Sequence, residues 1–349
     1  MLFIFTKQGD NQRHLLYYLI GLLLFLFSGL RYAGVDYFNY NDIFDKTANL
    51  WDLSLDNFYS VHGEFGFYII NVIIKSFDMP FEMLMIIIAF INIYLLVRNS
   101  QKYSMVPLMS ILLYYNRFYI DRNLGQIRAA VACMIVVYAL QYISDKNFKK
   151  YFFLVLAACM FHKLSLMAIV LYFVGNYELK NVSIIASMTI CAIIGAVIPI
   201  DDSVGLLLVY FSDMRFADYL GDTEYYMKDL GVFYPVTIMQ VIIVIIYLSM
   251  RDKLKKIMPY NNLMLNMYLL STLWLLLTHK FGIYAGRLAT LFGTAEIFLL
   301  AAMPYWFENK IYRYICIAFL SMISFTFLLI KISDIDRCPE YQSILELII

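Results

Sequence analysis

Charged residues are scarce in this chain of 349 residues, making up 15% of it, whereas soluble domains carry roughly a quarter. Hydrophobic residues make up 62%, and the mean hydropathy of +0.70 comes from long apolar blocks. This composition excludes an ordinary soluble domain and predicts an all-α polytopic membrane protein. Because similar blocks recur to the C-terminus and no small-residue cleavage pattern follows Leu30, we expect the first block to be a retained span rather than a signal peptide.

Motifs for metals and nucleotides are also lacking. The sequence has no His-x-x-x-His and no cysteine pair at ligand spacing, and it has neither a Walker loop nor a dinucleotide fingerprint. Four of the five cysteines lie inside apolar blocks, which argues against a disulfide framework. The net charge of +1 gives no reason to expect nucleic acid. We therefore expect no metal site and no cofactor.

What the chain does contain is a series of apolar stretches suited to the roughly 30 Å hydrocarbon core of a bilayer. With the N-terminus inside, the connections RNSQK, DKNFKK, ELK, RDKLKK and ENKIYR fall in the cytoplasm and hold dense Lys and Arg clusters, as the positive-inside rule predicts. The two stretches on either side of FHKLS are short, so one longer broken helix is an alternative there. The pattern predicts about eleven transmembrane helices, over 14–30, 80–97, 104–120, 124–143, 151–161, 164–174, 182–200, 233–250, 258–277, 284–304 and 311–332.

The stretch 64–77 is apolar but carries Lys75, and counting it as a crossing would move the later basic loops outside. We predict a re-entrant or interfacial helix on the periplasmic face, with a short tilted crossing as the alternative. The outer connections within 31–63 and 201–233 are each too short for an independent domain. Residues 1–349 are thus expected to form a single integral membrane domain, in which these two loops form part of the active site.

Basic side chains gather where the predicted spans reach the outer face, against the usual sorting of positive charge. Snorkelling to water explains any one of them, but arginines from four separate spans at one depth share no local cause. A guanidinium donates two parallel hydrogen bonds to phosphate oxygens, so a diphosphate on a lipid tail fits these apolar surroundings. The residues concerned are Arg31, Arg117, Arg122, Arg128, His162, Lys163, Arg215, Lys280 and Arg287.

Five motifs follow one another between about residues 31 and 300: RYAGVDYFNY, EFGFYIIN, QIRAAVA, FHKLSLMAIVLYF and GRLATLFGTAEIFLL. Their succession resembles the EpsG-like Wzy polymerases of bacterial O-antigen and exopolysaccharide synthesis. This chain reads Arg128-Ala129 where the family often has Arg-Gln, and EFGF where it often has Glu-Pro-Gly-Phe.

The resemblance implies a glycosyltransferase of GT-C-like architecture in the bacterial inner membrane, with its site facing the periplasm. It would move a growing glycan from undecaprenyl diphosphate to the non-reducing end of a repeat unit on a second undecaprenyl diphosphate. A chain-length regulator and a flippase are the protein partners that it implies.

Breaking a bond between a sugar and a diphosphate builds negative charge on the leaving group, so cations fixed beside it lower the barrier. Arg128 and Arg287 are the first choices for this role. A base must also lie within hydrogen-bond reach of the acceptor hydroxyl, and the sequence does not rank its candidates Asp36, Glu64 and His162. The expected substrate-binding residues are Arg31, Arg122, Gln126, Lys163, Arg215, Tyr37 and Tyr40.

Several of these residues have a structural alternative. Asp36 fits a helix cap or a turn, and His162, at an apolar break, fits a structural histidine. The rings of the first motif also fit an interfacial belt. We assign no role to His279 and expect a structural hydrogen bond for Glu296.

Two other functions remain open. A flippase for lipid-linked oligosaccharides would carry charge through the middle of its spans, often with internal repeats, but mid-span charge is sparse here and no clear repeat is found. A membrane O-acetyltransferase would need a histidine paired with a nucleophile or an acid deep in the bundle. The sequence favours a polymerase over both.

Overall fold

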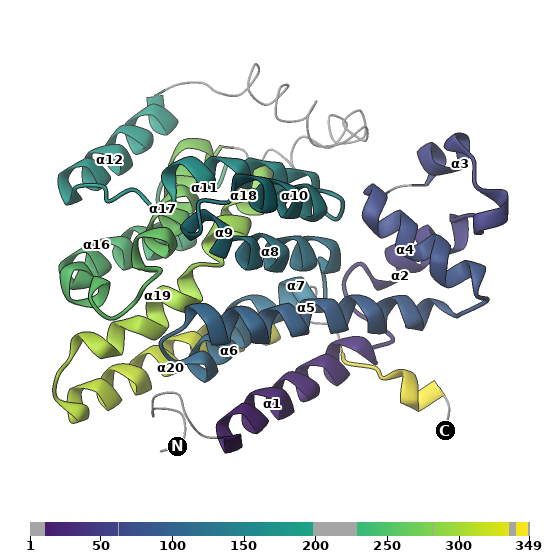
Figure 1. Cartoon of the computed structure of the whole chain (residues 1–349), viewed down its shortest axis with the longest axis horizontal. Coiled ribbons are helices and arrows are strands. Elements are labelled where there is room, and N and C mark those ends of the chain that lie inside the picture. The colour runs from purple at the N-terminus through teal and green to yellow at the C-terminus, as the bar shows by residue number, and fades with distance from the viewer. Residues whose placement is uncertain (1–10, 62, 198–228, 281, 335–339, 348–349) are drawn as a thin grey trace. The chain divides into compact units, whose positions relative to one another are not determined.

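The computed structural model is built from α-helices and describes residues 11–61, 63–197, 229–280, 282–334 and 340–347 (Figure 1). Within these residues no β-strand forms, and the extended backbone pairs only in an isolated antiparallel bridge between Arg31 and Ser343. The chain divides into two compact units, each described by itself. The first comprises Met1–Tyr138, Leu156–His162 and Leu300–Ile349, and the second comprises Ala139–Val155 and Lys163–Leu299.

The helices of the first unit come mainly from the N-terminal third of the chain. They are α1 (Asn11–Gly29), α2 (Tyr37–Lys46), α3 (Leu55–Ser60), α4 (Phe65–Ser76), α5 (Phe81–Tyr103), α6 (Pro107–Tyr114), the π-helix η3 (Tyr115–Tyr119), α7 (Ile120–Asn123) and α20 (Lys310–Ile332), with short 3-10 helices η2 (Leu50–Asp52), η5 (Met303–Trp306) and η6 (Ile344–Leu347).

The second unit holds α9 (Gln141–Ser144), the 3-10 helix η4 (Lys163–Ala168), α11 (Ile169–Val174), α12 (Asn181–Val197), α16 (Pro235–Lys255), α17 (Asn261–Thr278) and α18 (Gly282–Gly293). Three helices have residues in both units: α8 (Ile127–Ala139), α10 (Phe148–Cys159) and α19 (Glu296–Ala302).

Long apolar helices indicate a membrane protein, in agreement with the composition. In the described residues four helices are long and apolar enough to cross a bilayer, or five if the bent pair Ala285–Gly293 and Glu296–Trp306 counts as one span. Shorter apolar helices cover Leu15–Gly29, Phe65–Ser76, Lys163–Val174 and Asn181–Val197. The predicted total of about eleven spans therefore stays a prediction, although each of these helices lies close to an apolar stretch named above.

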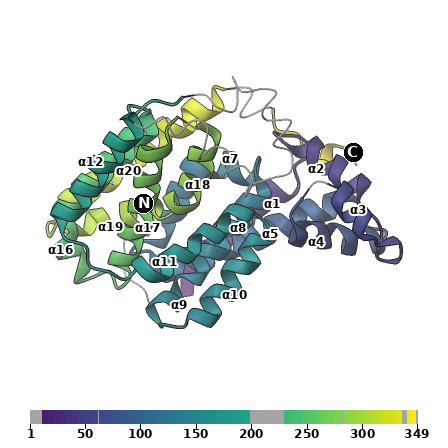
Figure 2. The ribbon, with the colours of Figure 1, turned by 90° about the horizontal axis from the view of Figure 1, so that it is seen from above.

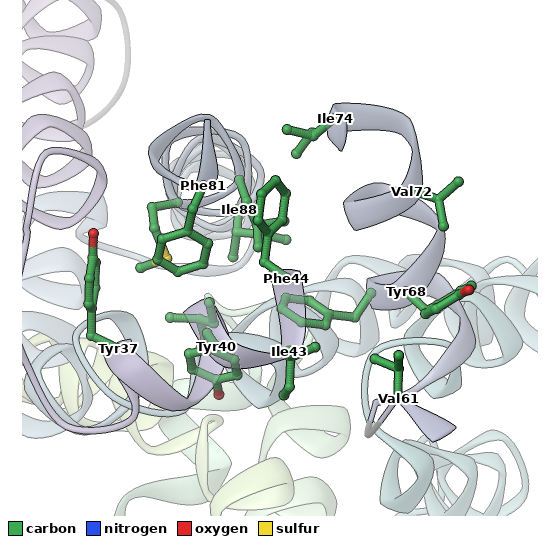
Figure 3. Packing of buried hydrophobic residues seen from close by; sticks show 14 of the residues in the cluster. Tyr37, Tyr40, Ile43, Phe44, Val61, Tyr68, Val72, Ile74, Phe81 and Ile88 are labelled. Atoms are coloured by element: carbon green, nitrogen blue, oxygen red, sulfur yellow. The ribbon is translucent and has the colours of Figure 1, made fainter. Parts of the chain in front are cut away.

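Aromatic rings hold α2 against α4 and α5 in the first unit. Tyr37, Tyr40 and Phe44 recur at helical spacing on α2 and are buried in one hydrophobic cluster, in which Figure 3 labels them. Phe81, at the start of α5, packs edge-on against Tyr37, with ring centroids 5.1 Å apart, and also contacts Phe44. This packing fixes the segment 31–46 relative to α5, although the segment is too short to fold alone.

Helix α17 lies at the centre of the second unit, where it packs against α11, α12, α16 and α18; Figures 1 and 2 show it between α16 and α18. The Asn266 side-chain amide donates to the carbonyl oxygens of Val174, Gly175 and Tyr177, which satisfies the open end of α11. Glu296 accepts a hydrogen bond of 2.9 Å from the Tyr268 hydroxyl, which confirms the structural bond expected for this residue.

The two short apolar stretches around FHKLS fold back on each other. Within the second unit the Tyr151 hydroxyl donates to the Ala168 carbonyl oxygen, and the rings of Phe148 and Tyr172 lie 4.9 Å apart. Phe148 thus lies beside Tyr172, and Tyr151 lies beside Ala168, so the two segments run in opposite directions. These contacts favour two antiparallel segments over one longer broken helix.

Candidate active site

A close backbone approach at the start of α4 builds the candidate site in the first unit. The Gly66 amide donates to the Met160 carbonyl oxygen at 2.8 Å. A Cβ at Gly66 would lie 2.8 Å from the Met160 Cβ and 2.9 Å from its carbonyl oxygen, so only glycine allows this approach. It places Glu64, the residue before α4, beside His162, which lies 98 positions farther along the chain.

We therefore expect Gly66→Ala to destabilise the protein by about 1–3 kcal/mol, because the new methyl group overlaps backbone rather than a movable side-chain end. Thermal unfolding in detergent measures this effect. Gly63→Ala is the matched control, since a methyl group there meets Phe67 and Arg128 at 3.7 and 3.8 Å, ordinary contact distances. Equal melting temperatures for the two variants would contradict the packing argument.

The Glu64 carboxylate joins two basic side chains from distant segments. Its Oε2 atom accepts a hydrogen bond from Nη1 of Arg128, and its Oε1 atom lies 3.5 Å from Nδ1 of His162. The side chains of Arg128, Glu64 and His162 are 20%, 13% and 19% exposed. The cluster is thus largely shielded from water while each member remains partly accessible.

The guanidinium of Arg128 lies between two aromatic rings. Its carbon Cζ is 5.6 Å from the centroid of the Tyr40 ring and 5.5 Å from that of Phe67. The Tyr40 and Phe67 rings also contact each other, with centroids 5.6 Å apart. These contacts fix the direction of the Arg128 fork, which suits it to a ligand that needs donors in fixed positions.

The Glu64 carboxyl group is a stronger acid here than an ordinary glutamic acid side chain. Burial alone would raise its pKa, but the hydrogen bond with His162 and the charge of Arg128 outweigh burial and lower the pKa to about 2. Glu64 is therefore ionised at neutral pH. A carboxylate of such low pKa is a weak proton acceptor, so this setting suits it to hold its neighbours rather than to take a proton itself.

Arg31 follows α1 and is 1% exposed. Its Nη1 atom donates to the carbonyl oxygen of Leu124, just before α8, and its Cζ atom lies 5.8 Å from the Tyr37 ring centroid. Gly34, with a φ of +135°, leaves the space for this side chain, since a Cβ there would lie 2.5 Å from Nη1. Burial lowers the pKa of Arg31 to about 10, so it is still charged at neutral pH.

Arg31 and Arg128 thus lie along one helix of the first unit. They contact the rings of Tyr37 and Tyr40, which are one turn apart on the same face of α2. Because the guanidinium of Arg31 is buried while that of Arg128 is partly exposed, only Arg128 of this pair is open to a ligand. Arg31 instead anchors the segment that leads into α8.

Asp36 occupies the N-cap position of α2 in the left-handed conformation, with a φ of 64°. Its side chain makes no cap hydrogen bond but accepts one of 3.4 Å from the Asn39 amide. The Tyr37 amide donates to the Gly34 carbonyl oxygen at 3.2 Å, so the turn expected beside Gly34 is present. The half-buried carboxylate lies one residue before Tyr37.

Two other candidates, Arg122 on α7 and Gln126, lie just before the start of α8. Arg122 is 1% exposed, and its Cζ atom lies 4.3 Å from the Phe118 ring centroid. Gln126 has an exposed side chain, and its carbonyl oxygen accepts from the Ala130 amide in the first turn of α8. A ligand role for either residue stays a prediction.

The remaining candidates belong to the second unit or lie outside the described residues. Arg287 is half-buried on α18, and Lys163 begins η4, which packs against α18. Arg215 lies outside the described residues. The gathering of Arg287 with Arg31 and Arg128 at one site remains a prediction.

The structure also contains a carboxylate–histidine pair that the sequence reasoning missed. Nδ1 of His279 lies 3.0 Å from Oδ1 of Asp229, and the Leu230 amide donates to the His279 carbonyl oxygen. Burial tends to raise the pKa of Asp229, but the hydrogen bond from His279 and other contacts lower it overall. The pair ties the chain before α16 to the end of α17. Because 50 positions separate its members, no local pattern could indicate it.

The whole arrangement can be compared with known proteins. The chain matches the EpsG family over residues 14–345 and therefore belongs to it. This is a family of Wzy-like polymerases, which suggests a polysaccharide repeat-unit polymerase with glycosyltransferase activity on lipid-linked oligosaccharides. No curated protein and no solved structure matches the chain significantly.

Proposed function

We propose that this protein is an O-antigen or related polysaccharide polymerase that transfers a growing glycan from undecaprenyl diphosphate to the non-reducing end of a lipid-linked repeat unit. Membership of the EpsG family supports the reaction class. The observation that carries the assignment to a site is the Glu64 carboxylate between Arg128 and His162. This cluster offers a fixed cation and an imidazole within one partly shielded place.

In this mechanism the acceptor hydroxyl oxygen attacks the anomeric carbon of the donor glycan. The bond from that carbon to the diphosphate breaks, and its electron pair leaves with undecaprenyl diphosphate. Arg128, joined by Arg287 in the assembled site, donates to the diphosphate oxygens as charge develops on them. The hydroxyl proton passes to a base, and the anomeric carbon becomes bonded to the acceptor oxygen.

His162 is the best placed base, since Nδ1 faces Glu64 and leaves Nε2 for the acceptor hydroxyl. Glu64 acts as a positioning residue, because its carboxylate orients both the imidazole and the guanidinium. Asp36 is the second candidate base, and Tyr37 and Tyr40 contribute ring faces and hydroxyl groups for sugars. Arg122, Gln126, Lys163 and Arg215 support binding of the diphosphate, and Arg31 supports it indirectly by anchoring the segment that leads into α8.

The wider setting follows from the same assignment. We propose a single GT-C-like membrane domain of about eleven spans in the bacterial inner membrane, with the site facing the periplasm and the outer connections 31–63 and 201–233 forming part of it. Arginines replace a divalent ion, so the reaction is metal-independent. A flippase supplies the repeat units, and a separate regulator limits chain length.

Reconstitution tests this function directly. Purified protein in liposomes receives lipid-linked repeat units isolated from cells that lack it, without any nucleotide sugar and with a chelator present. We expect a ladder of lengthened lipid-linked products on gels. Single units that never lengthen, with or without divalent ions, would contradict polymerase activity, and single units that cross the bilayer unchanged would favour transport.

A further inference from the structure

A second polar site lies in the other unit, where α12 begins and α16 ends. An open pocket of about 540 Å³ is found there, a size typical of ligand pockets. In the predicted topology this end faces the cytoplasm, because the basic connections ELK and RDKLKK form it. The lining residues are Glu178, Leu179, Lys180, Asn181, Val182, Arg251 and Asp252.

Arg251 supplies a buried charge to this pocket. It is 4% exposed, and its guanidinium donates to the Leu179 carbonyl oxygen and, at 3.3 and 3.4 Å, to the side-chain oxygens of Asn181 and Asn262. All three acceptors are neutral, and the Nε atom has no hydrogen-bond partner. Within the described part of the chain, no carboxylate forms an ion pair with Arg251. A buried cation whose hydrogen bonds all go to neutral groups favours an anionic ligand, since burying a charge without a directly paired anion is costly.

The surrounding groups strengthen the preference for an anion. Helix α12 starts at Asn181 and runs for 17 residues, so its first-turn amides and its dipole favour negative charge at this end. Lys180 adds an exposed ammonium group. The Glu178 carboxylate is close enough to Arg251 to interact with its charge, but it is ion-paired with Lys255, which balances it. Asp252 is the remaining acid on the lining, and it leaves an excess of positive charge.

The exposed apolar face of α12 indicates that the anion belongs to a lipid. Val182 lines the pocket and is 77% exposed, and Ile185, one turn farther along, is 50% exposed. Tyr177, just before the pocket segment, is 67% exposed. In a membrane protein these apolar side chains face acyl chains, while an amphipathic ring such as that of Tyr177 suits headgroup depth.

We propose that this pocket binds the phosphodiester group of a membrane phospholipid, held by Arg251, Lys180 and the first turn of α12, with the acyl chains along the exposed face of α12. Such a lipid would fasten α12 to α16 at the cytoplasmic end of the second unit. This site is distinct from the Glu64 cluster and is independent of the proposed reaction.

Native mass spectrometry of the full-length protein in detergent tests the site. The protein is titrated with a short-chain phosphatidylglycerol, with the matching diacylglycerol and with inorganic phosphate. We expect binding of the phospholipid but not of the diacylglycerol. Lys180→Gln should weaken it about fivefold, because one basic residue contributes about that much near an anionic surface, and Arg251→Gln should weaken it further.

Lys256→Gln is the matched control, because it removes the same charge from an exposed position that does not line the pocket. Lys180 is exposed, so its replacement tests binding even if Arg251→Gln folds poorly. Lys180→Arg should retain the affinity. Equal lipid binding by the Lys180→Gln and Lys256→Gln variants overturns the site, as does equal binding of diacylglycerol. Binding of inorganic phosphate without lipid binding assigns the pocket to a soluble phosphate and overturns the lipid assignment.

Discussion

Replacing Arg128 with alanine is expected to abolish long-chain polymer while lipid-linked single units are still made and exported. The guanidinium of Arg128 is held by Glu64 and by the rings of Tyr40 and Phe67, so its direction is set before a ligand arrives. Removing one such fixed donor from a developing anion costs about 10²–10³ in rate. The measurement is the length distribution of surface polysaccharide in cells, followed by the rate of ladder formation with purified protein.

Arg98→Ala is the matched control, because Arg98 is an exposed arginine on α5 outside the candidate site. Arg128→Lys separates charge from geometry: a lysine keeps the cation but loses the planar fork, so we expect it to restore only a small part of the rate. Arg287→Ala should reproduce the loss seen for Arg128→Ala. Chains of normal length from the Arg128→Ala variant would remove Arg128 from the mechanism.

The positions of many helices could be predicted from the sequence because each depends on a local pattern. The apolar runs 80–97 and 311–332 match α5 and α20, which are among the four long apolar helices. The run 104–120 predicts one helix, and the structure has one continuous helical segment, Pro107–Asn123, in which a π-helical turn separates α6 from α7. The π-helical turn depends on how this segment packs, which hydropathy does not record.

Glu64, Arg128 and His162 are each candidates from the sequence, but their mutual contacts do not follow from it. Glu64 lies in EFGF and His162 in FHKLS, two of the motifs that carry the family resemblance, and both residues are candidate bases by their chemistry. Their meeting depends on Gly66 packing against Met160, a contact between segments that no spacing rule predicts. For the same reason the pairing of His279 with Asp229 was missed.

Glu64→Gln is expected to lower the turnover rate by about 10²–10⁴ with a much smaller change in KM. The amide keeps the size of the side chain but removes the charge that holds Arg128 and His162. Glu64→Asp keeps the charge on a shorter side chain and should recover part of the rate. Both variants are compared in the ladder assay, with melting temperatures measured alongside to exclude misfolding. Wild-type turnover by Glu64→Gln would exclude a positioning role for Glu64.

The low pKa of Glu64 also predicts how the stability of the folded protein changes at acidic pH. A carboxyl group whose pKa falls from 4.5 to about 2 on folding contributes stability that is fully present above pH 4.5. Since a pKa difference of one corresponds to about 1.4 kcal/mol, the contribution is roughly 3 kcal/mol. It is lost as the pH falls toward 2. Wild-type protein should therefore lose melting temperature relative to Glu64→Gln only below about pH 4.5. A difference between the two that does not change from pH 7 to pH 3 would contradict the ionised pair.

Combining substitutions distinguishes the candidate bases. If Glu64 acts through His162, then Glu64→Gln in a His162→Gln background should cost much less than it does alone, because the residue it positions is already gone. Any remaining loss reports the hold of Glu64 on Arg128 and should vanish when Arg128→Ala is also present. Asp36→Asn should instead multiply the loss of His162→Gln, since among the described residues no hydrogen bond or ion pair joins Asp36 to Glu64 or to His162. If Asp36→Asn alone abolishes turnover while His162→Gln retains it, Asp36 is the base and the histidine is structural.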